Sequence, residues 1–216
     1  MEKGQVIIID GDAAVCDALK RLLKSDGIAA HIYSSAEEFI QSSDIHDTGC
    51  LLLDMHLPGI SGLQLLEYLR KNRISFPAIL MTGDGDVETA VNAMKKGARD
   101  FIVKPFDNKQ VLESVKTCLL ESEQDHDRHA RQDEVLAMIA KLTKREHEVM
   151  NYLMDGNQNK QIAKILGISH RTVELHRAKV MEKLQANTLS GVVRLGLTAG
   201  LIDASCDIKY DRIQKA

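Results

Sequence analysis

Residues 6–15 read VIIIDGDAAV, in which an apolar run meets two aspartates that a single glycine separates. Four consecutive apolar residues before a charged residue predict a short strand that is buried on both faces. Residues 14–24, which follow, carry apolar side chains at helical spacing, and Gly27 ends that segment. The stretch therefore predicts a strand, a polar loop and a helix in immediate succession.

The same order of strand and helix recurs through the first 120 residues. Apolar runs predict further strands at residues 29–33, 50–53, 78–81 and 101–103. Amphipathic segments predict helices from residue 36, over 63–73 and 87–96, and from residue 108. Ser35 and Glu38 have the spacing of a capping box at the start of the first of these helices. Five strand–helix units in strict alternation predict an α/β fold, a doubly wound five-stranded parallel sheet with helices on both faces.

The composition is that of a soluble globular protein, with 44% apolar and 27% charged residues. No run approaches the ~18 apolar residues that a membrane span needs. The first residues lack the layout of a signal peptide, and the four cysteines are scattered without CxxC spacing. We therefore expect a cytoplasmic protein with no membrane partner.

Charge is unevenly distributed along the chain. Residues 1–120 hold 13 basic and 17 acidic side chains, whereas residues 141–201 hold 10 basic and 5 acidic ones. A basic segment inside a protein of net charge −3 indicates a partner such as nucleic acid for that segment. A merely solvated basic face is the alternative.

Polar side chains follow four of the predicted strands directly. Asp10 and Asp54 end two of them, Thr82 a third and Lys104 a fourth. Ligands bind at the carboxyl ends of the strands in open α/β sheets, so we expect these four residues to form one site. Two carboxylates suit Mg²⁺, and a carboxylate can also attack phosphorus to give an aspartyl phosphate. Lys104 and Thr82 would then stabilise the transferring phosphoryl group.

The strings LLLDMHLPGISG, ILMTGDGDV and FIVKPF resemble those of receiver domains in two-component response regulators, which have a flavodoxin-like fold. The resemblance covers roughly residues 4–120. It implies that Asp54 accepts a phosphoryl group from a sensor histidine kinase and that Lys104, expected to precede a cis proline, contacts the phosphate. It further implies that Thr82 and Phe101 are the pair that moves on phosphorylation. Asp10, Asp54 and the backbone carbonyl of His56 would bind Mg²⁺.

Gly11 is the departure from that family, because receivers usually carry an acid that reaches the metal at this position. Asp12 is a candidate to replace it, since the neighbouring glycine permits unusual backbone angles. We expect Mg²⁺ to bind more weakly than in a usual receiver and phosphorylation to be slower. A tolerated substitution with little effect is the alternative.

The second half of the chain has clear helix signals. Residues 121–140 predict a helical or flexible linker, residues 141–202 an all-α four-helix domain, and residues 203–216 a polar tail. Thr143 and Glu146 form a capping box before the first helix. A second helix over residues 159–166 ends at Gly167, and Ser169 caps a third. Two short helices joined by a glycine-containing turn predict a helix-turn-helix, whose second helix enters the major groove of DNA.

LTKRE, NKQIA, LGIS and TVELH, in this order, resemble the LuxR-type DNA-binding domain, so the whole chain resembles the NarL/FixJ response regulators. The resemblance makes residues 171–184 the recognition helix. Its candidates for base contacts are Arg171, Glu174, Leu175 and Ala178, and its candidates for phosphate contacts are Lys160, Thr172, His176 and Lys179. Residues 187–199 should form a fourth helix that mediates dimerisation through Leu189, Val192 and Val193 or packs against the helix-turn-helix.

We therefore interpret the chain as a phosphorylation-switched transcription regulator rather than an enzyme. Its expected partners are a histidine kinase, double-stranded promoter DNA, RNA polymerase and a second copy of itself. The first alternative is a DNA-binding regulator whose receiver is degenerate at Gly11 and acts independently of phosphorylation. The second alternative is a stand-alone Mg²⁺-dependent phosphatase. Two points disfavour it: it would leave the basic domain without a role, and no further carboxylate is placed as a catalytic acid or base.

Overall fold

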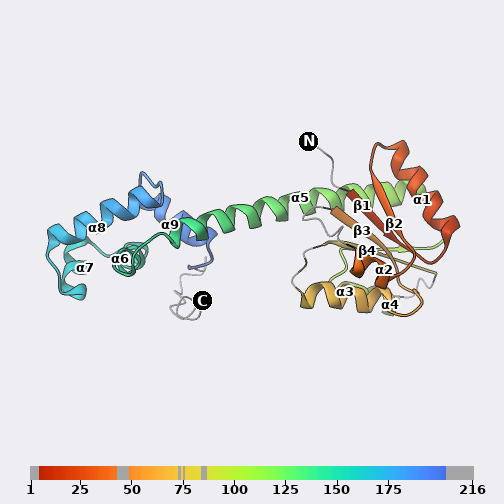
Figure 1. The fold of residues 1–216 in the computed structure, drawn as a ribbon, viewed down its shortest axis with the longest axis horizontal. Helices are drawn as coiled ribbons and strands as arrows, with labels where there is room; N and C mark the ends of the chain where they lie inside the picture. Colours follow the sequence, from red (N-terminus) through yellow and green to blue (C-terminus); the bar gives the residue numbers. More distant parts are fainter. Residues whose placement is uncertain (1–4, 43–48, 73, 75, 84–86, 203–216) are drawn as a thin grey trace. The chain divides into compact units, whose positions relative to one another are not determined.

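The computed structural model describes residues 5–42, 49–72, 74, 76–83 and 87–202 (Figure 1). The chain divides into two compact units, Met1–Asp127 and Arg128–Ala216. The expected polar tail at 203–216 lies outside the described residues, and the division at 1–120, 121–140 and 141–202 stays a prediction. Among the helices that the structure describes, none is long and apolar enough to cross a bilayer.

The first unit contains the predicted five-stranded parallel sheet (Figure 1). Its strands are β1 (Gln5–Ile9), β2 (Ala30–Tyr33), β3 (Gly49–Asp54), β4 (Ala78–Thr82) and β5 (Asp100–Val103), in the order β2-β1-β3-β4-β5. All four strand pairings are parallel. Every residue of β3 and β4 is buried, as continuous apolar runs predict for strands covered on both faces.

Helices α1 (Ala13–Ser25), α2 (Ala36–Gln41), α3 (Gly62–Lys71), α4 (Val87–Lys95) and α5 (Asn108–Ile139) accompany the sheet. Alternate residues of each strand enter different apolar clusters. Ile7 and Leu51 join a cluster with residues of α2 and α3, whereas Ile8 and Leu52 join one with residues of α1 and α5. This two-residue period fixes the strand register, because a slip by one residue would exchange the two faces.

The capping box predicted at α2 is only half correct. The Ser35 hydroxyl accepts the Glu38 N–H at 3.2 Å, as expected. The Glu38 carboxylate, however, accepts the N–H and the hydroxyl of Ser34, each at 2.8 Å, instead of the Ser35 N–H. Ser34 offers two donors where Ser35 would offer one, so the carboxylate reaches one residue further.

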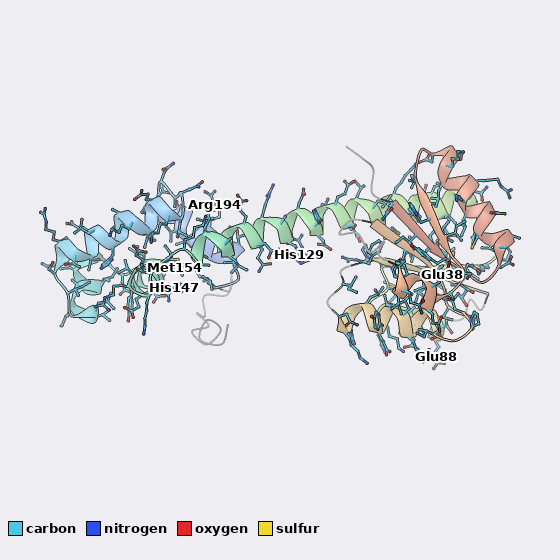
Figure 2. The ribbon with its side chains drawn as sticks, viewed as in Figure 1. Glu38, Glu88, His129, His147, Met154 and Arg194 are labelled. Carbon is cyan, nitrogen blue, oxygen red and sulfur yellow. The ribbon has the colours of Figure 1, made fainter. Side chains whose placement is uncertain are left out.

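The second unit consists of the end of α5 and four shorter helices, α6 (Lys144–Met154), α7 (Asn159–Leu166), α8 (His170–Lys183) and α9 (Leu189–Thr198). Figure 2 shows their side chains and labels His147 and Met154, which both belong to α6. The capping box of Thr143 and Glu146 is complete, and Gly167 ends α7 with a φ of 64°. The predicted helix-turn-helix is confirmed, with α7 and α8 as its two helices.

Helix α9 begins two residues later than predicted, because Thr188 caps it by accepting the Gly191 N–H. Val192 is fully buried in an apolar cluster with Met150 and Val180. Leu189 is partly buried against the cluster that contains Val173. Val192 and Leu189 therefore pack against the helix-turn-helix, and dimerisation through this helix stays a prediction.

Candidate functional site

Four polar residues meet where β1, β3, β4 and β5 end. Asp10 follows β1, Asp54 and Thr82 are the last residues of β3 and β4, and Lys104 follows β5. The Lys104 ammonium donates to Asp10 Oδ2 at 2.7 Å and to Asp54 Oδ1 at 3.1 Å. The lysine therefore bridges the two carboxylates. These carboxylates are neighbours because β1 and β3 are adjacent strands of the sheet.

The two carboxylates differ in their surroundings. Asp10 is 2% exposed in its side chain, and its Oδ1 also accepts the Asp12 N–H at 2.9 Å. The side chain of Asp54 is 12% exposed, and within the described part of the chain it accepts the longer of the two Lys104 hydrogen bonds. Asp10 is thus held from two sides, whereas Asp54 keeps an accessible carboxylate edge.

Electrostatics hold Lys104 in its charged form. Burial by itself lowers the pKa of this ammonium, but the hydrogen bonds and charges of Asp10 and Asp54 outweigh it and raise the pKa above its usual value. Nearby, the Cys16 thiol donates to the Asp10 carbonyl at 3.4 Å. Burial, followed by the charges of Asp10 and Asp12, raises the pKa of Cys16 to about 11, so this thiol stays neutral near pH 7.

Asp12 is engaged in a different task. Its Oδ1 accepts the N–H groups of Ala14 and Val15 at 2.8 and 3.4 Å and so caps α1. An Asp12 carboxylate that turned toward the metal would lose this cap, which typically contributes about 1 kcal/mol. Among the residues that the structure describes, a Cβ at Gly11 would meet only Pro58 Cδ, at 3.8 Å, so they leave room for a side chain there.

The two carboxylates are of the chemical type that suits Mg²⁺. Asp10 and Asp54 supply two carboxylates, and Mg²⁺ in proteins is often held by one or two carboxylates and several waters. Within the described part of the chain, no group of three or more acidic, histidine or cysteine side chains gathers to hold a metal. The His56 side chain is exposed and contains no oxygen, so the oxygen that His56 could offer is its backbone carbonyl.

Thr82 and Phe101 lie on the neighbouring strands β4 and β5. Thr82 is fully buried, and its carbonyl accepts the Lys104 N–H at 2.6 Å. Phe101 is partly buried against the core cluster on the α2 and α3 side of the sheet. The expected cis peptide between Lys104 and Pro105 is present. Thr82 is thus hydrogen-bonded to the backbone of Lys104, the residue that binds both carboxylates, and Phe101 precedes Lys104 by three residues in the chain.

The predicted DNA-contacting residues divide into an exposed group and a partly buried group. Five residues of α8 and one of α7 are exposed: Arg171, Glu174, Leu175, Ala178, Lys179 and Lys160. Thr172 is half-buried, and its hydroxyl shares a hydrogen bond with Ser169 at 2.8 Å at the start of α8. His176 is also half-buried, and its Nδ1 is a buried atom without a hydrogen-bond partner in the described protein.

Sequence reasoning recognised Glu146 only as a helix cap. Its carboxylate accepts the Thr143 N–H at 2.8 Å and also the Lys183 ammonium at 2.6 Å, which joins the start of α6 to the end of α8. Hydrogen bonding by Lys183, and then by Thr143, lowers the pKa of Glu146 from 4.5 to about 2. Arg145 similarly donates to the last carbonyl of α7, that of Leu166, at 2.7 Å. The first contact fixes the recognition helix α8 to α6, and the second fixes α7 to α6.

Comparisons with known proteins match both halves of the chain. The response regulator receiver domain matches residues 6–116, and the LuxR family of bacterial regulatory proteins matches residues 140–195. The transcriptional regulatory protein FixJ of Bradyrhizobium diazoefficiens is 39% identical over 93% of this chain and 98% of its own length. Nodulation protein W of the same organism is 36% identical over 92% of this chain and 88% of its own length. Among solved structures, the response regulator StyR has a TM-score of 0.79 at 35% identity, covering 89% of this chain and 98% of that one.

Proposed function

This chain belongs to the two-component response regulators that join a receiver domain to a LuxR-type DNA-binding domain, and we propose that phosphorylation of Asp54 controls its binding to DNA. A sensor histidine kinase is the proposed donor. An oxygen of Asp54 attacks phosphorus while the bond from phosphorus to the histidine nitrogen of the donor breaks. The family is one of transcription regulators, so the reaction is a switch rather than a catalytic cycle on a small-molecule substrate.

The observation that carries this proposal is the unequal binding of the two carboxylates. Among the described residues, Asp10 accepts from two hydrogen-bond donors and its side chain is 2% exposed, whereas Asp54 accepts from Lys104 and its side chain is 12% exposed. A nucleophile must be reachable, so Asp54 is the acceptor and Asp10 supports the site. Lys104 donates to Asp54 at 3.1 Å, and in the proposal it contacts the phosphoryl group once that group is attached.

Mg²⁺, when bound by Asp10, Asp54 and the His56 carbonyl, would offset negative charge on the phosphoryl group. The chain's own residues supply the rest of the switch. In the proposal the Thr82 hydroxyl donates a hydrogen bond to the phosphoryl group, and Phe101 changes position together with Thr82. The moved elements create a dimer face on the receiver, and the paired α8 helices meet DNA half-sites about one helical turn apart.

The DNA-binding proposal assigns base reading to the exposed face of α8 and phosphate contacts to its neighbours. Leu175, at 59% exposure, is a large apolar side chain that the fold leaves in solvent, which suits contact with a thymine methyl group. Lys160 and Lys179 would bind phosphates and set the register. The proposal also includes RNA polymerase as a partner at the promoter and the cytoplasm as the location.

A receiver that works without phosphorylation is the second candidate, and Gly11 is the observation that favours it. Intact-mass measurement after incubation with acetyl phosphate and Mg²⁺ distinguishes the two. We expect the wild-type chain to gain one phosphoryl group, Asp54→Asn to gain none, and Gly11→Asp to gain it faster. If only Gly11→Asp is modified, the missing acid disables the site and the phosphorylation-independent function becomes the better account.

A further inference from the structure

The loop that follows Asp54, residues 55–61, is fixed at several points. At its start the Met55 N–H donates to the Met81 carbonyl at 2.8 Å, and the Met55 carbonyl accepts the Gly62 N–H at 3.2 Å. Leu57 is buried in the core cluster. In the second half of the loop, Glu37 of α2 reaches across and accepts the Ile60 N–H with its Oε1 at 2.9 Å. We call residues 55–61 the acceptor loop.

The Glu37 carboxylate also fills the space beside Gly59. Gly59 has a φ of +76°, and a Cβ added there would collide with Glu37 Oε1. One residue earlier, Pro58 lies next to the other side of the site, because its Cδ would be 3.8 Å from a Cβ at Gly11. Residues 58–60 of the acceptor loop therefore lie beside both Gly11 and the Glu37 carboxylate.

Because Gly11 supplies no carboxylate, metal binding should depend more on the acceptor loop here than in a site with a third acid. Asp10 and Asp54 are the carboxylates that meet at Lys104, and Asp12 caps α1 instead. In the proposed ligand set, the further protein oxygen is the His56 carbonyl, which belongs to the acceptor loop. A backbone ligand binds only as well as its loop is held, since groups outside the coordination shell orient the groups inside it.

We propose that Glu37 is a positioning residue for metal binding, which holds the acceptor loop so that the His56 carbonyl completes the ligand set beside Asp10 and Asp54. The inference rests on the proposed function, because the metal in question is the Mg²⁺ of the phosphorylation site. Glu37 itself touches neither metal nor phosphoryl group and acts through the Ile60 N–H.

The chain offers a matched control in the next residue. Glu38 also lies in the first turn of α2 and carries the same charge, but its carboxylate binds Ser34 (Figure 2 labels Glu38). Glu37→Ala and Glu38→Ala both remove a favourable charge from the start of the helix. Only Glu37→Ala releases the Ile60 N–H. Glu37→Gln removes the charge and keeps an acceptor oxygen for that N–H.

The test measures the dissociation constant for Mn²⁺ by water-proton relaxation, and that for Mg²⁺ by competition, on the full chain. We expect Glu37→Ala to weaken binding about tenfold, in the range usual for groups that orient metal ligands. Glu37→Gln and Glu38→Ala should stay within about twofold of the wild type. With acetyl phosphate, Glu37→Ala should need more Mg²⁺ for half-maximal phosphorylation but reach the wild-type rate at saturation.

Equal affinity in Glu37→Ala and wild type would overturn the inference, as would equal weakening in Glu37→Gln and Glu37→Ala. If Glu37→Ala fails to fold, Glu37→Asp carries the same test, because its side chain is one methylene shorter and withdraws the carboxylate from the Ile60 N–H. A wild-type chain that binds metal but gains no phosphoryl group refutes the proposed function and leaves Glu37 to be judged on affinity. A wild-type chain that binds no metal refutes the role of Glu37 directly.

Discussion

Replacing Glu146 by glutamine would remove the charge that joins the recognition helix to α6 while keeping the cap on the Thr143 N–H. Lowering a pKa from 4.5 to about 2 corresponds to about 3 kcal/mol, at about 1.4 kcal/mol per pKa unit. The Glu146 side chain is 4% exposed, but that of Lys183 is 33% exposed, so solvent screens the pair. We therefore expect Glu146→Gln to lower the free energy of unfolding of the second unit by about 1–2 kcal/mol at pH 7.

The pH dependence has a definite sign. Because folding lowers the pKa of Glu146, its stabilisation is complete above pH 4.5 and is lost as the pH falls toward about 2. The difference between wild type and Glu146→Gln should therefore shrink between pH 5 and pH 3. Urea unfolding followed by the methyl resonances of Val173 and Val180, both fully buried in the second unit, measures it.

Lys183→Met closes a double-mutant cycle with Glu146→Gln. The two single substitutions and the double one should cost similar amounts, since each removes the same ion pair. Lys183 also donates to the Lys141 carbonyl at 3.1 Å, so its own substitution should cost slightly more. A difference from wild type below about 0.5 kcal/mol at pH 7, which is the size of ordinary surface effects, would refute this reasoning, as would a difference that stays the same at pH 3.

Three further predictions concern other groups. Burial lowers the pKa of His147, so the unfolded state takes up a proton more readily than the folded state. The second unit should therefore lose stability as the pH falls below 6.5. Urea unfolding at pH 7 and 5.5 should show a smaller loss for His147→Gln than for the wild type. Lys104→Met leaves two buried carboxylates without their cation and should cost the first unit about 3 kcal/mol, measured in the same way; a cost under about 1 kcal/mol would argue against the ion pairs. Lys179→Gln should lower the slope of log affinity for non-specific DNA against log salt by about 1 in fluorescence anisotropy titrations, whereas Lys109→Gln, in the first unit, should leave that slope unchanged.

The fold was largely predictable because its signals are local. Buried parallel strands appear as unbroken apolar runs, so β3 and β4 were found to within one residue at each end. Gly167 takes a positive φ at the end of α7, a backbone conformation that residues with a side chain rarely adopt. The approximate meeting of Asp10, Asp54 and Lys104 also followed from the sequence, because the carboxyl ends of parallel strands share one edge.

The contacts that refine the site were not predictable, because they depend on where separate elements come to rest. Nothing near Glu37 in the sequence indicates that its carboxylate binds an N–H 23 residues away. Lys183 and Glu146 are 37 residues apart and lie on different helices. Even the local choice of Glu38 between Ser34 and Ser35 depends on one additional hydroxyl donor. Polar side chains have several acceptable partners, and only the tertiary structure selects among them.

Charge counting at the acid site explains why Gly11 should weaken metal binding without abolishing the switch. With Asp10, Asp54 and Lys104 charged, the site carries a formal charge of −1, and a third acid at position 11 would make it −2. A divalent cation would therefore take the formal charge of the present site to +1 but that of the three-acid site to zero. The electrostatic attraction for Mg²⁺ is thus weaker here. Phosphorylation gives Asp54 a charge of about −1.5 to −2 in place of its carboxylate charge of −1, which brings the metal-bound site from +1 to between about +0.5 and zero. The metal should thus bind the phosphorylated form better than the unmodified one, and by linkage it should favour phosphorylation even where its resting affinity is low.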